Sequence, residues 1–176
     1  LQSDLNVYCL AEELLLDFEP GLGATVSRRL EHYIVADDVP VVDVAPLDGL
    51  LSVQGPAAEP VVRALGLFAQ PPAEPLGVEH AADPALGELY LANQPRLGSS
   101  GFDRFVPNAA LTAVAEKLVS AAKAAGGRLC GWEALEMARI EAGIPRFGVD
   151  MDESHLPPEC GIEARAMSYS QGCYIG

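Results

Sequence analysis

The chain carries few positive charges and has no apolar run of about eighteen residues, the length needed to span a bilayer. Lysine and arginine total 11 against 25 aspartate and glutamate residues, so the formal net charge is −14 over 176 residues. The cations are scattered, so a basic patch for a nucleic-acid backbone is not expected. The lack of a long apolar run excludes a transmembrane helix.

Cysteine is sparse, and the chain shows none of the common short catalytic motifs. Cys9, Cys130, Cys160 and Cys173 are widely spaced, without a C-x-x-C pair. A chain of this length does not need disulfide staples, so reduced thiols in a cytoplasmic protein are expected. The sequence also lacks a glycine-rich phosphate loop, a G-x-S-x-G elbow and an H-E-x-x-H motif. Ordinary nucleotide-binding and hydrolase sites therefore lose their main support.

What the chain does contain is ample apolar material in periodic patterns. Apolar residues make up 49% of the sequence, enough for one soluble domain or two small ones. Alternating runs predict a hairpin over 4–10 and 14–18, and strand pairs over 39–44 with 49–53 and 89–91 with 102–106. Helical spacing predicts helices over 25–37, 56–65, 108–125 and 132–142. The pattern favours an α+β fold with antiparallel sheets and helices packed on them.

Proline divides the chain into two parts. Residues 69–85 contain four prolines and little periodicity, which predicts a long loop or a link between subdomains. We therefore expect a first α+β unit over 1–68, a proline-rich connection over 69–85, and a second α+β unit over 86–176. Because a strand pair followed by a helix occurs twice, the two units are interpreted as duplicated.

Glu141 is a candidate functional residue because of its place on a helix. It lies in the last turn of the helix predicted over 132–142, where the unpaired carbonyls disfavour a carboxylate by ~0.3–1 kcal/mol. Either an exposed glutamate tolerates this cost, or the carboxylate accepts N–H donors from a ligand. Arg139, two residues earlier, points away from Glu141 on a helix and is no natural partner for it.

Two other clusters near the C-terminal end allow more than one interpretation. Acidic, histidine and cysteine side chains crowd into residues 150–160, but their spacing matches no defined metal site, so we predict a solvated acidic loop and no metal. Cys173 lies between glycines and an aromatic residue in the segment 170–176. Its thiol is either accessible and reactive or a small buried group in a turn.

Four short motifs, taken together, resemble the YgfZ branch of the superfamily that contains the glycine-cleavage T-protein, a group of tetrahydrofolate-binding proteins. Residues 171–176 are similar to the branch's K-G-C-Y-x-G-Q-E signature, with Gln171 in place of lysine. Residues 139–145 resemble R-x-E-A-G-x-P, and residues 51–57 resemble L-x-x-Q-G-P-x-A. The stretch 3–5 resembles the strand that carries the family's folate-side aspartate, here Asp4.

The resemblance implies a fold, a cofactor and site residues. The fold is the duplicated ferredoxin-like, GcvT-type folate-binding architecture, with further N-terminal strands and a C-terminal β-barrel outside this chain. The cofactor is tetrahydrofolate. By this resemblance Glu141 binds the pteridine ring, Arg139, Tyr174 and Asp4 contribute to cofactor binding, and Asp4 and Cys173 are the catalytic candidates.

Two departures from the T-protein branch set the leading hypothesis. That branch usually has two adjacent aspartates where this chain has Ser3 and Asp4, and it lacks the cysteine that Cys173 matches. The resemblance then implies a folate-binding helper in iron–sulfur cluster assembly or repair, and in some members tRNA modification, with assembly proteins or clients as partners. One alternative is an aminomethyl or one-carbon transferase with Asp4 as the acid/base. A second alternative is an interaction scaffold that binds no ligand.

Overall fold

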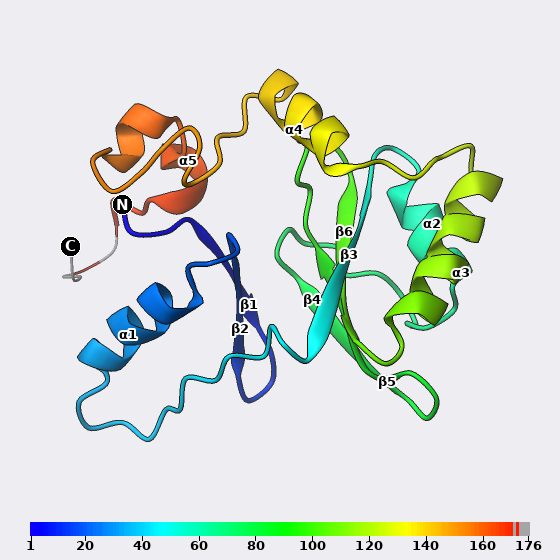
Figure 1. The fold of residues 1–176 in the computed structure, drawn as a ribbon, viewed down its shortest axis with the longest axis horizontal. Coiled ribbons are helices and arrows are strands. Elements are labelled where there is room, and N and C mark those ends of the chain that lie inside the picture. The colour runs from blue at the N-terminus through cyan, green and yellow to red at the C-terminus, as the bar shows by residue number, and fades with distance from the viewer. Residues whose placement is uncertain (171, 173–176) are drawn as a thin grey trace.

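The computed structural model describes residues 1–170 and 172, and within them the largest element is an antiparallel sheet, called here the main sheet. It is formed by β3 (Asp48–Gln54), β4 (Val78–Asp83), β5 (Gly87–Asn93) and β6 (Gly101–Pro107). The strand order is β3-β6-β5-β4 (Figure 1). The predicted pairing of 89–91 with 102–106 is confirmed, with Leu91 opposite Arg104.

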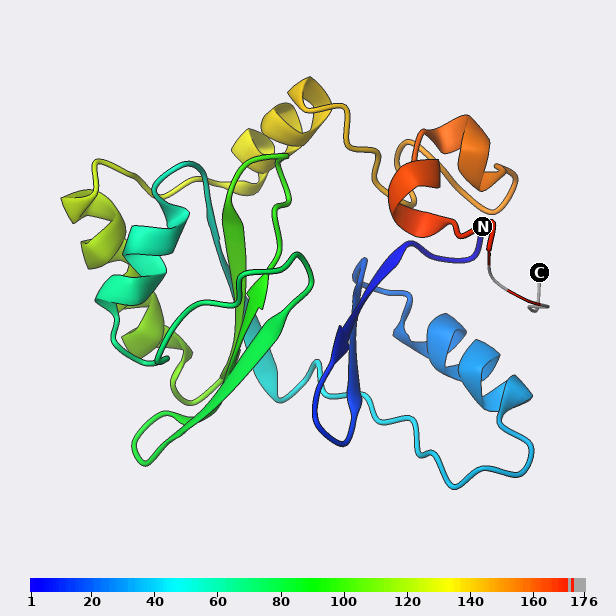
Figure 2. The same ribbon diagram turned by 180° about the vertical axis from the view of Figure 1, so that it is seen from behind.

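Two helices, α2 (Ala58–Ala64) and α3 (Leu111–Ala124), cover one face of the main sheet, as Figures 1 and 2 both show. Their apolar stripes pack on the sheet and form the core. The buried cluster is Val61, Leu89, Val106, Ala110, Val114 and Leu118. Both predicted helices and the α+β class are therefore confirmed.

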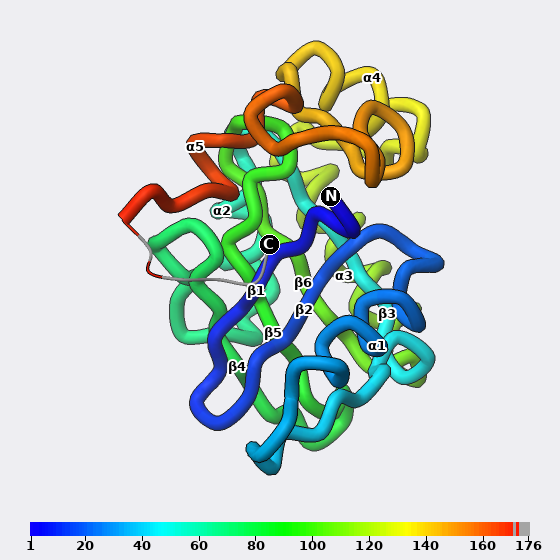
Figure 3. The backbone as a smooth tube through the Cα atoms, turned by 90° about the vertical axis from the view of Figure 1, so that its left-hand side faces the viewer, coloured from blue at the N-terminus to red at the C-terminus, as the bar shows by residue number. Residues whose placement is uncertain are grey.

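A hairpin lies against the opposite face of the main sheet. It consists of β1 (Leu5–Cys9) and β2 (Leu14–Phe18), paired as the sequence predicts. The ring of Tyr8 meets Phe105 of β6 edge-on, with centroids 5.8 Å apart. Helix α1 (Gly23–Tyr33) lies beyond the hairpin, as Figure 3 also shows, and buries Val26. The order of layers is therefore α2 and α3, the main sheet, the hairpin, and α1.

The described residues that follow α3 lie over one end of these layers (Figure 1). Helix α4 (Trp132–Glu141) crosses that end, and the chain then forms a short 3₁₀ helix, η1 (Pro157–Cys160), and α5 (Glu163–Ala166) beside the N-terminus (Figures 1 and 2). Gly143, with φ of +68°, follows the end of α4, because only glycine takes this backbone conformation without strain. In residues 1–170 and 172, no helix is both long and apolar enough to cross a membrane.

Two predicted elements are wrong. Residues 39–44 are not a strand, and the partner of β3 is β6 rather than this segment. Pro40 and Pro46 have no N–H to donate, and Val42 stays 68% exposed because no sheet face covers it. The predicted connection over 69–85 is not wholly a loop, since it contains β4, an edge strand whose weak apolar pattern hid it. The main sheet thus combines strands from both sides of the segment predicted to separate two units.

Candidate functional site

Glu141, the predicted pterin ligand, ends α4 with a free carboxylate. The side chain is exposed, and within residues 1–170 and 172 no hydrogen bond or ion pair reaches it. The negative end of the helix dipole does not favour this charge. The arrangement leaves the carboxylate able to accept hydrogen bonds from a bound molecule.

Asp4, the second predicted carboxylate, lies just before β1 and is half-buried. Its Oδ2 accepts a hydrogen bond from Arg165 of α5 at 2.8 Å. Alternation along the strand places Asp4 on the same side of β1 as Asn6 and Tyr8, the side that faces the main sheet. In the described part of the chain, no direct contact joins Asp4 to Glu141.

Arg139 is the buried residue of α4, at 6% exposure. Its Nε and one terminal nitrogen donate to the carboxylate of Glu136, at 3.1 and 2.8 Å. The other terminal nitrogen donates to the backbone oxygen of Ile144 and to Asp150. The expectation that Arg139 does not pair with Glu141 is confirmed. These protein groups accept four hydrogen bonds from its guanidinium, and its part in cofactor binding stays a prediction.

Arg146 extends the same network beyond α4, and the sequence analysis missed it. Its Nε donates to Glu19 at 3.2 Å, and a terminal nitrogen donates to Glu136 at 2.6 Å. Its guanidinium also lies 5.1 Å from the ring centroid of Trp132. Hydrogen bonds from Arg139 and then Arg146 lower the pKa of Glu136 to about 2. Because Glu19 is distant in sequence, no local pattern predicts this contact.

A polar layer separates the hairpin from the main sheet. Arg96 donates to Asp17 of β2 and to Asp103 of β6, both at 2.7 Å. The second oxygen of Asp103 accepts from the hydroxyl of Ser52 at 2.6 Å. Burial raises the pKa of Asp103, although Arg96 and Ser52 act against that rise. Arg96 therefore links the hairpin, which Asp4 precedes, to the main sheet.

Tyr8 contributes a buried hydroxyl to this layer. The residue is 0% exposed, and among the residues that the structure describes its hydroxyl has no hydrogen-bond partner. Burial, and then the charges of Asp17 and Asp103, raise the pKa of Tyr8 well above its usual range. The hydroxyl therefore stays protonated at neutral pH and able to donate.

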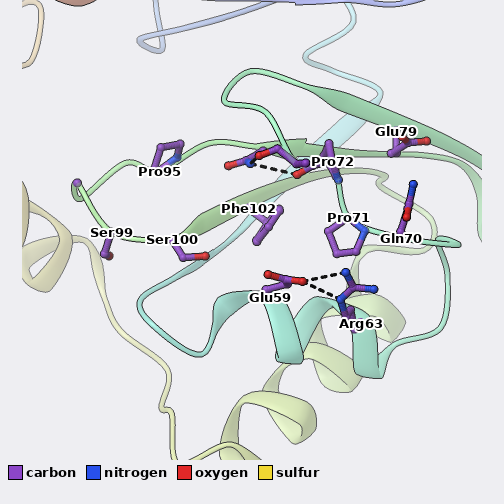
Figure 4. Close-up of a pocket in the computed structure, with 13 residues that line it drawn as sticks. Glu59, Arg63, Gln70, Pro71, Pro72, Glu79, Pro95, Ser99, Ser100 and Phe102 are labelled. Atoms are coloured by element: carbon purple, nitrogen blue, oxygen red, sulfur yellow. Dashed lines mark hydrogen bonds and ion pairs between the residues drawn. The ribbon is translucent and has the colours of Figure 1, made fainter.

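A cleft among the described residues lies elsewhere, between α2 and the loop that joins β5 to β6 (Figure 4). Its volume is about 640 Å³, and it contains none of the predicted site residues. Glu59 and Arg63 of α2 form a half-exposed ion pair there, at 2.8 Å. The rest of the lining includes Gln70, Pro71, Pro72, Asn93, Ser99, Ser100 and Phe102.

The other two predicted site residues, Cys173 and Tyr174, lie outside the described residues. Asp150 accepts from the backbone N–H of Arg146 and from Arg139, whereas Asp152 accepts from Ser154. In the part of the chain that the structure describes, no group of three or more histidine, cysteine or acidic side chains could hold a metal ion.

Comparison with known proteins identifies the family. The profile of the GCVT N-terminal domain matches residues 1–168. An aminomethyltransferase of Cupriavidus necator is 33% identical over 172 residues, covering 90% of this chain and 45% of that protein. An aminomethyltransferase of Cupriavidus taiwanensis is 35% identical over 144 residues, covering 81% and 36%. One from a Picosynechococcus species is 34% identical over 138 residues, covering 76% and 36%.

This chain spans less than half the length of these relatives. The matches confirm the GcvT-like superfamily that the motifs predict, and they do not single out the YgfZ branch. The mixed α+β architecture, with antiparallel sheets and helices packed on them, agrees with this assignment. The chain belongs to the GCVT N-terminal domain family.

Proposed function

We propose that this chain is the tetrahydrofolate-binding part of a folate-dependent aminomethyl or one-carbon transferase. The observation that carries the proposal is the exposed carboxylate of Glu141 at the end of α4, which no described residue engages. A carboxylate can accept two parallel N–H bonds from the aminopterin edge of a folate. Membership in the GCVT N-terminal domain family supports this ligand class.

Asp4 is the proposed acid/base. Bound tetrahydrofolate supplies the nitrogen that carries the one-carbon unit. Asp4 would exchange a proton with a folate nitrogen, and Arg165 orients its carboxylate through the 2.8 Å contact.

The names of the relatives favour the transferase over the helper that the motifs suggest. The three relatives described above are aminomethyltransferases. The second candidate is a YgfZ-type helper in iron–sulfur cluster assembly or repair, with assembly proteins or clients as partners. It is supported by Ser3 in place of the first aspartate and by the motif around Cys173. A cytoplasmic setting is proposed with it, because Cys9, Cys130 and Cys160 are free thiols.

Calorimetric titration tests the folate site. Tetrahydrofolate and its 5-formyl derivative are titrated into the full-length protein, its Glu141→Gln variant and its Glu133→Gln variant. Glu133 is a matched control, because it is an exposed glutamate in the first turn of the same helix. Loss of charged hydrogen bonds in Glu141→Gln is expected to weaken binding by at least about tenfold. Equal affinities in all three proteins, or no binding by the parent, would overturn the proposal.

Turnover separates the transferase from the helper. We expect the parent to transfer the methylene carbon of an added aminomethyl thioether to the nitrogens of tetrahydrofolate, with release of the thiol and ammonia. Asp4→Asn should lose this turnover while keeping its folate affinity. A parent that binds folate but shows no turnover favours the helper. A parent that binds no folate leaves only the interaction scaffold.

A further inference from the structure

Helix α4 buries a charged residue, Arg139, while its inward apolar residues, Leu135 and Ala138, are only half-buried. Trp132, Met137 and Ile140 are 57%, 62% and 61% exposed. A helix of a globular domain normally docks through its apolar face. The position of α4, and so of Glu141 at its end, therefore depends on the ion pairs that Arg139 and Glu136 make.

Within the described residues, Arg146 is the side chain that connects this network to the hairpin. It donates to Glu136 on α4 and to Glu19, which follows β2. The last pair of the hairpin ladder is Leu5 with Phe18, so the next positions outward are Asp4 and Glu19. Arg146 thus reaches the strand end that carries Asp4 and the helix that carries Glu141.

The surroundings of Arg146 favour a fixed geometry over a loose surface contact. The side chains of Arg146, Glu19 and Glu136 are only 24%, 27% and 23% exposed, so solvent screens these pairs less than exposed ones. The guanidinium also lies over the ring of Trp132. A planar guanidinium donates to the two carboxylates from separate nitrogens in a fixed geometry, whereas all three N–H groups of a lysine lie on one nitrogen.

We propose that Arg146 is a positioning residue, which fixes the separation of Asp4 and Glu141 by tying α4 to the end of the hairpin. This inference rests on the proposed folate site, to which both carboxylates belong. Arg146 acts through Glu19 and Glu136 and not by contact with the folate.

Hydrogen exchange tests the tie itself, without any folate. Arg146→Met keeps an unbranched side chain but removes the guanidinium, and with it both ion pairs and the contact with the ring of Trp132. We expect the amides of residues 135–142 to exchange about tenfold faster in this variant, because local opening becomes easier. Glu19→Gln breaks the same link from its other end and should reproduce the effect. Arg63→Met, which removes the half-exposed pair with Glu59 far from α4, should leave exchange unchanged.

Folate titration of the same variants tests the positioning role. Arg146→Met and Glu19→Gln are each expected to weaken binding of 5-formyltetrahydrofolate about tenfold, the size typical of losing a supporting group behind a ligand contact. The double variant should be no weaker than either single one, because the two residues act as a unit. Arg146→Lys should recover part of the affinity, which a general loss of stability would not explain.

The outcomes are distinct. Faster exchange with weaker folate binding supports the inference. Unchanged exchange overturns it whatever the folate affinity, and so does faster exchange with parental affinity. If Arg146→Met fails to fold by circular dichroism, Glu19→Gln and Arg146→Lys decide the same question. A parent that binds no folate overturns the proposed function itself, and the titration of the unmutated protein reveals that case separately.

Discussion

The two faces of the main sheet are stabilised in opposite ways. On the α2 and α3 side, Val61, Leu89 and Val114 pack without polar partners. On the hairpin side, Arg96 bridges Asp17 and Asp103 across the layer. Apolar packing is non-directional and tolerates many sequences, whereas a buried ion pair needs particular partners at particular distances. The side built from specific pairs is also the side on which Asp4 lies.

Alternate side chains of strand β6 face the two sides of the main sheet. Phe102, Arg104 and Val106 face the helices, and Asp103 and Phe105 face the hairpin. Arg104 departs from the rule, since it lies on the apolar face at 1% exposure with its guanidinium 5.3 Å from the ring of Phe68. Within residues 1–170 and 172, its three nitrogens have no hydrogen-bond partner. Burial lowers the pKa of Arg104 to about 10, so it remains charged at neutral pH.

The largest effect on stability is expected from replacing Arg96 in the polar layer between the hairpin and the main sheet. Arg96→Met leaves the buried carboxylate of Asp103 without its cation, and the free energy of unfolding should fall by about 3–5 kcal/mol in urea titrations. Arg63→Met, which removes an exposed pair, should cost no more than about 1 kcal/mol. Similar losses in the two variants would contradict a special role for the polar layer.

The same variant has a defined pH dependence. Without Arg96, burial of Asp103 is opposed less, so its pKa in the folded protein rises further above the unfolded value. A carboxyl group whose pKa is higher in the folded than in the unfolded protein adds to the free energy of unfolding at pH values below its unfolded pKa. This contribution is lost as the pH rises through its folded pKa. The loss in free energy of unfolding caused by Arg96→Met should therefore be smaller at a pH near the ordinary aspartate pKa than at neutral pH.

On the apolar side, Leu89→Ala should open a cavity in the core. Leu89 is 0% exposed, and such truncations cost about 2–5 kcal/mol. Leu14→Ala is the matched control, since this leucine is 64% exposed on the hairpin, and it should change stability by no more than about 0.5 kcal/mol. Equal losses of stability for Leu89→Ala and Leu14→Ala in urea titrations would show that Leu89 is not part of the core.

Arg104→Met removes the one buried charge that the described residues place on the apolar face of the main sheet, and so increases the contrast between its two faces. Replacing a buried charge with an apolar side chain of similar volume is expected to raise the free energy of unfolding by about 1–4 kcal/mol. Arg104→Lys keeps the buried charge and should bring no gain. A loss of stability in Arg104→Met would show that the guanidinium has a compensating partner.

The smallest effect is expected at low pH, from protonation of Glu136. Its pKa in the folded protein is lowered to about 2, so its pairs with Arg139 and Arg146 contribute stability above the ordinary glutamate pKa. That contribution is lost as pH falls from the ordinary value towards about 2. Fluorescence of Trp132, the single tryptophan, should report the change. Glu136→Gln should lack this transition, and its persistence would assign the signal to another group.

Local patterns were sufficient for much of the fold. Alternation located the hairpin, and helical spacing located α2, α3 and α4 together with core residues such as Val114 and Leu118. These elements are readable because the spacing of apolar residues matches the repeat of the backbone. Short motifs likewise predicted the family, with Glu141 and Asp4 as candidate site residues, although the sequence did not predict the ion pair of Asp4 with Arg165.

The sequence by itself determined most of the apolar side of the main sheet, because α2, α3, β5 and β6 each carry their own periodic pattern of apolar residues. Only the tertiary structure decided that β3 pairs with β6, that residues 39–44 have no partner strand, and that Arg146 meets Glu19. The physical reason is sequence separation. Apolar burial needs only the right spacing, whereas a strand pair or an ion pair needs one particular partner, which chain topology brings close from far along the sequence.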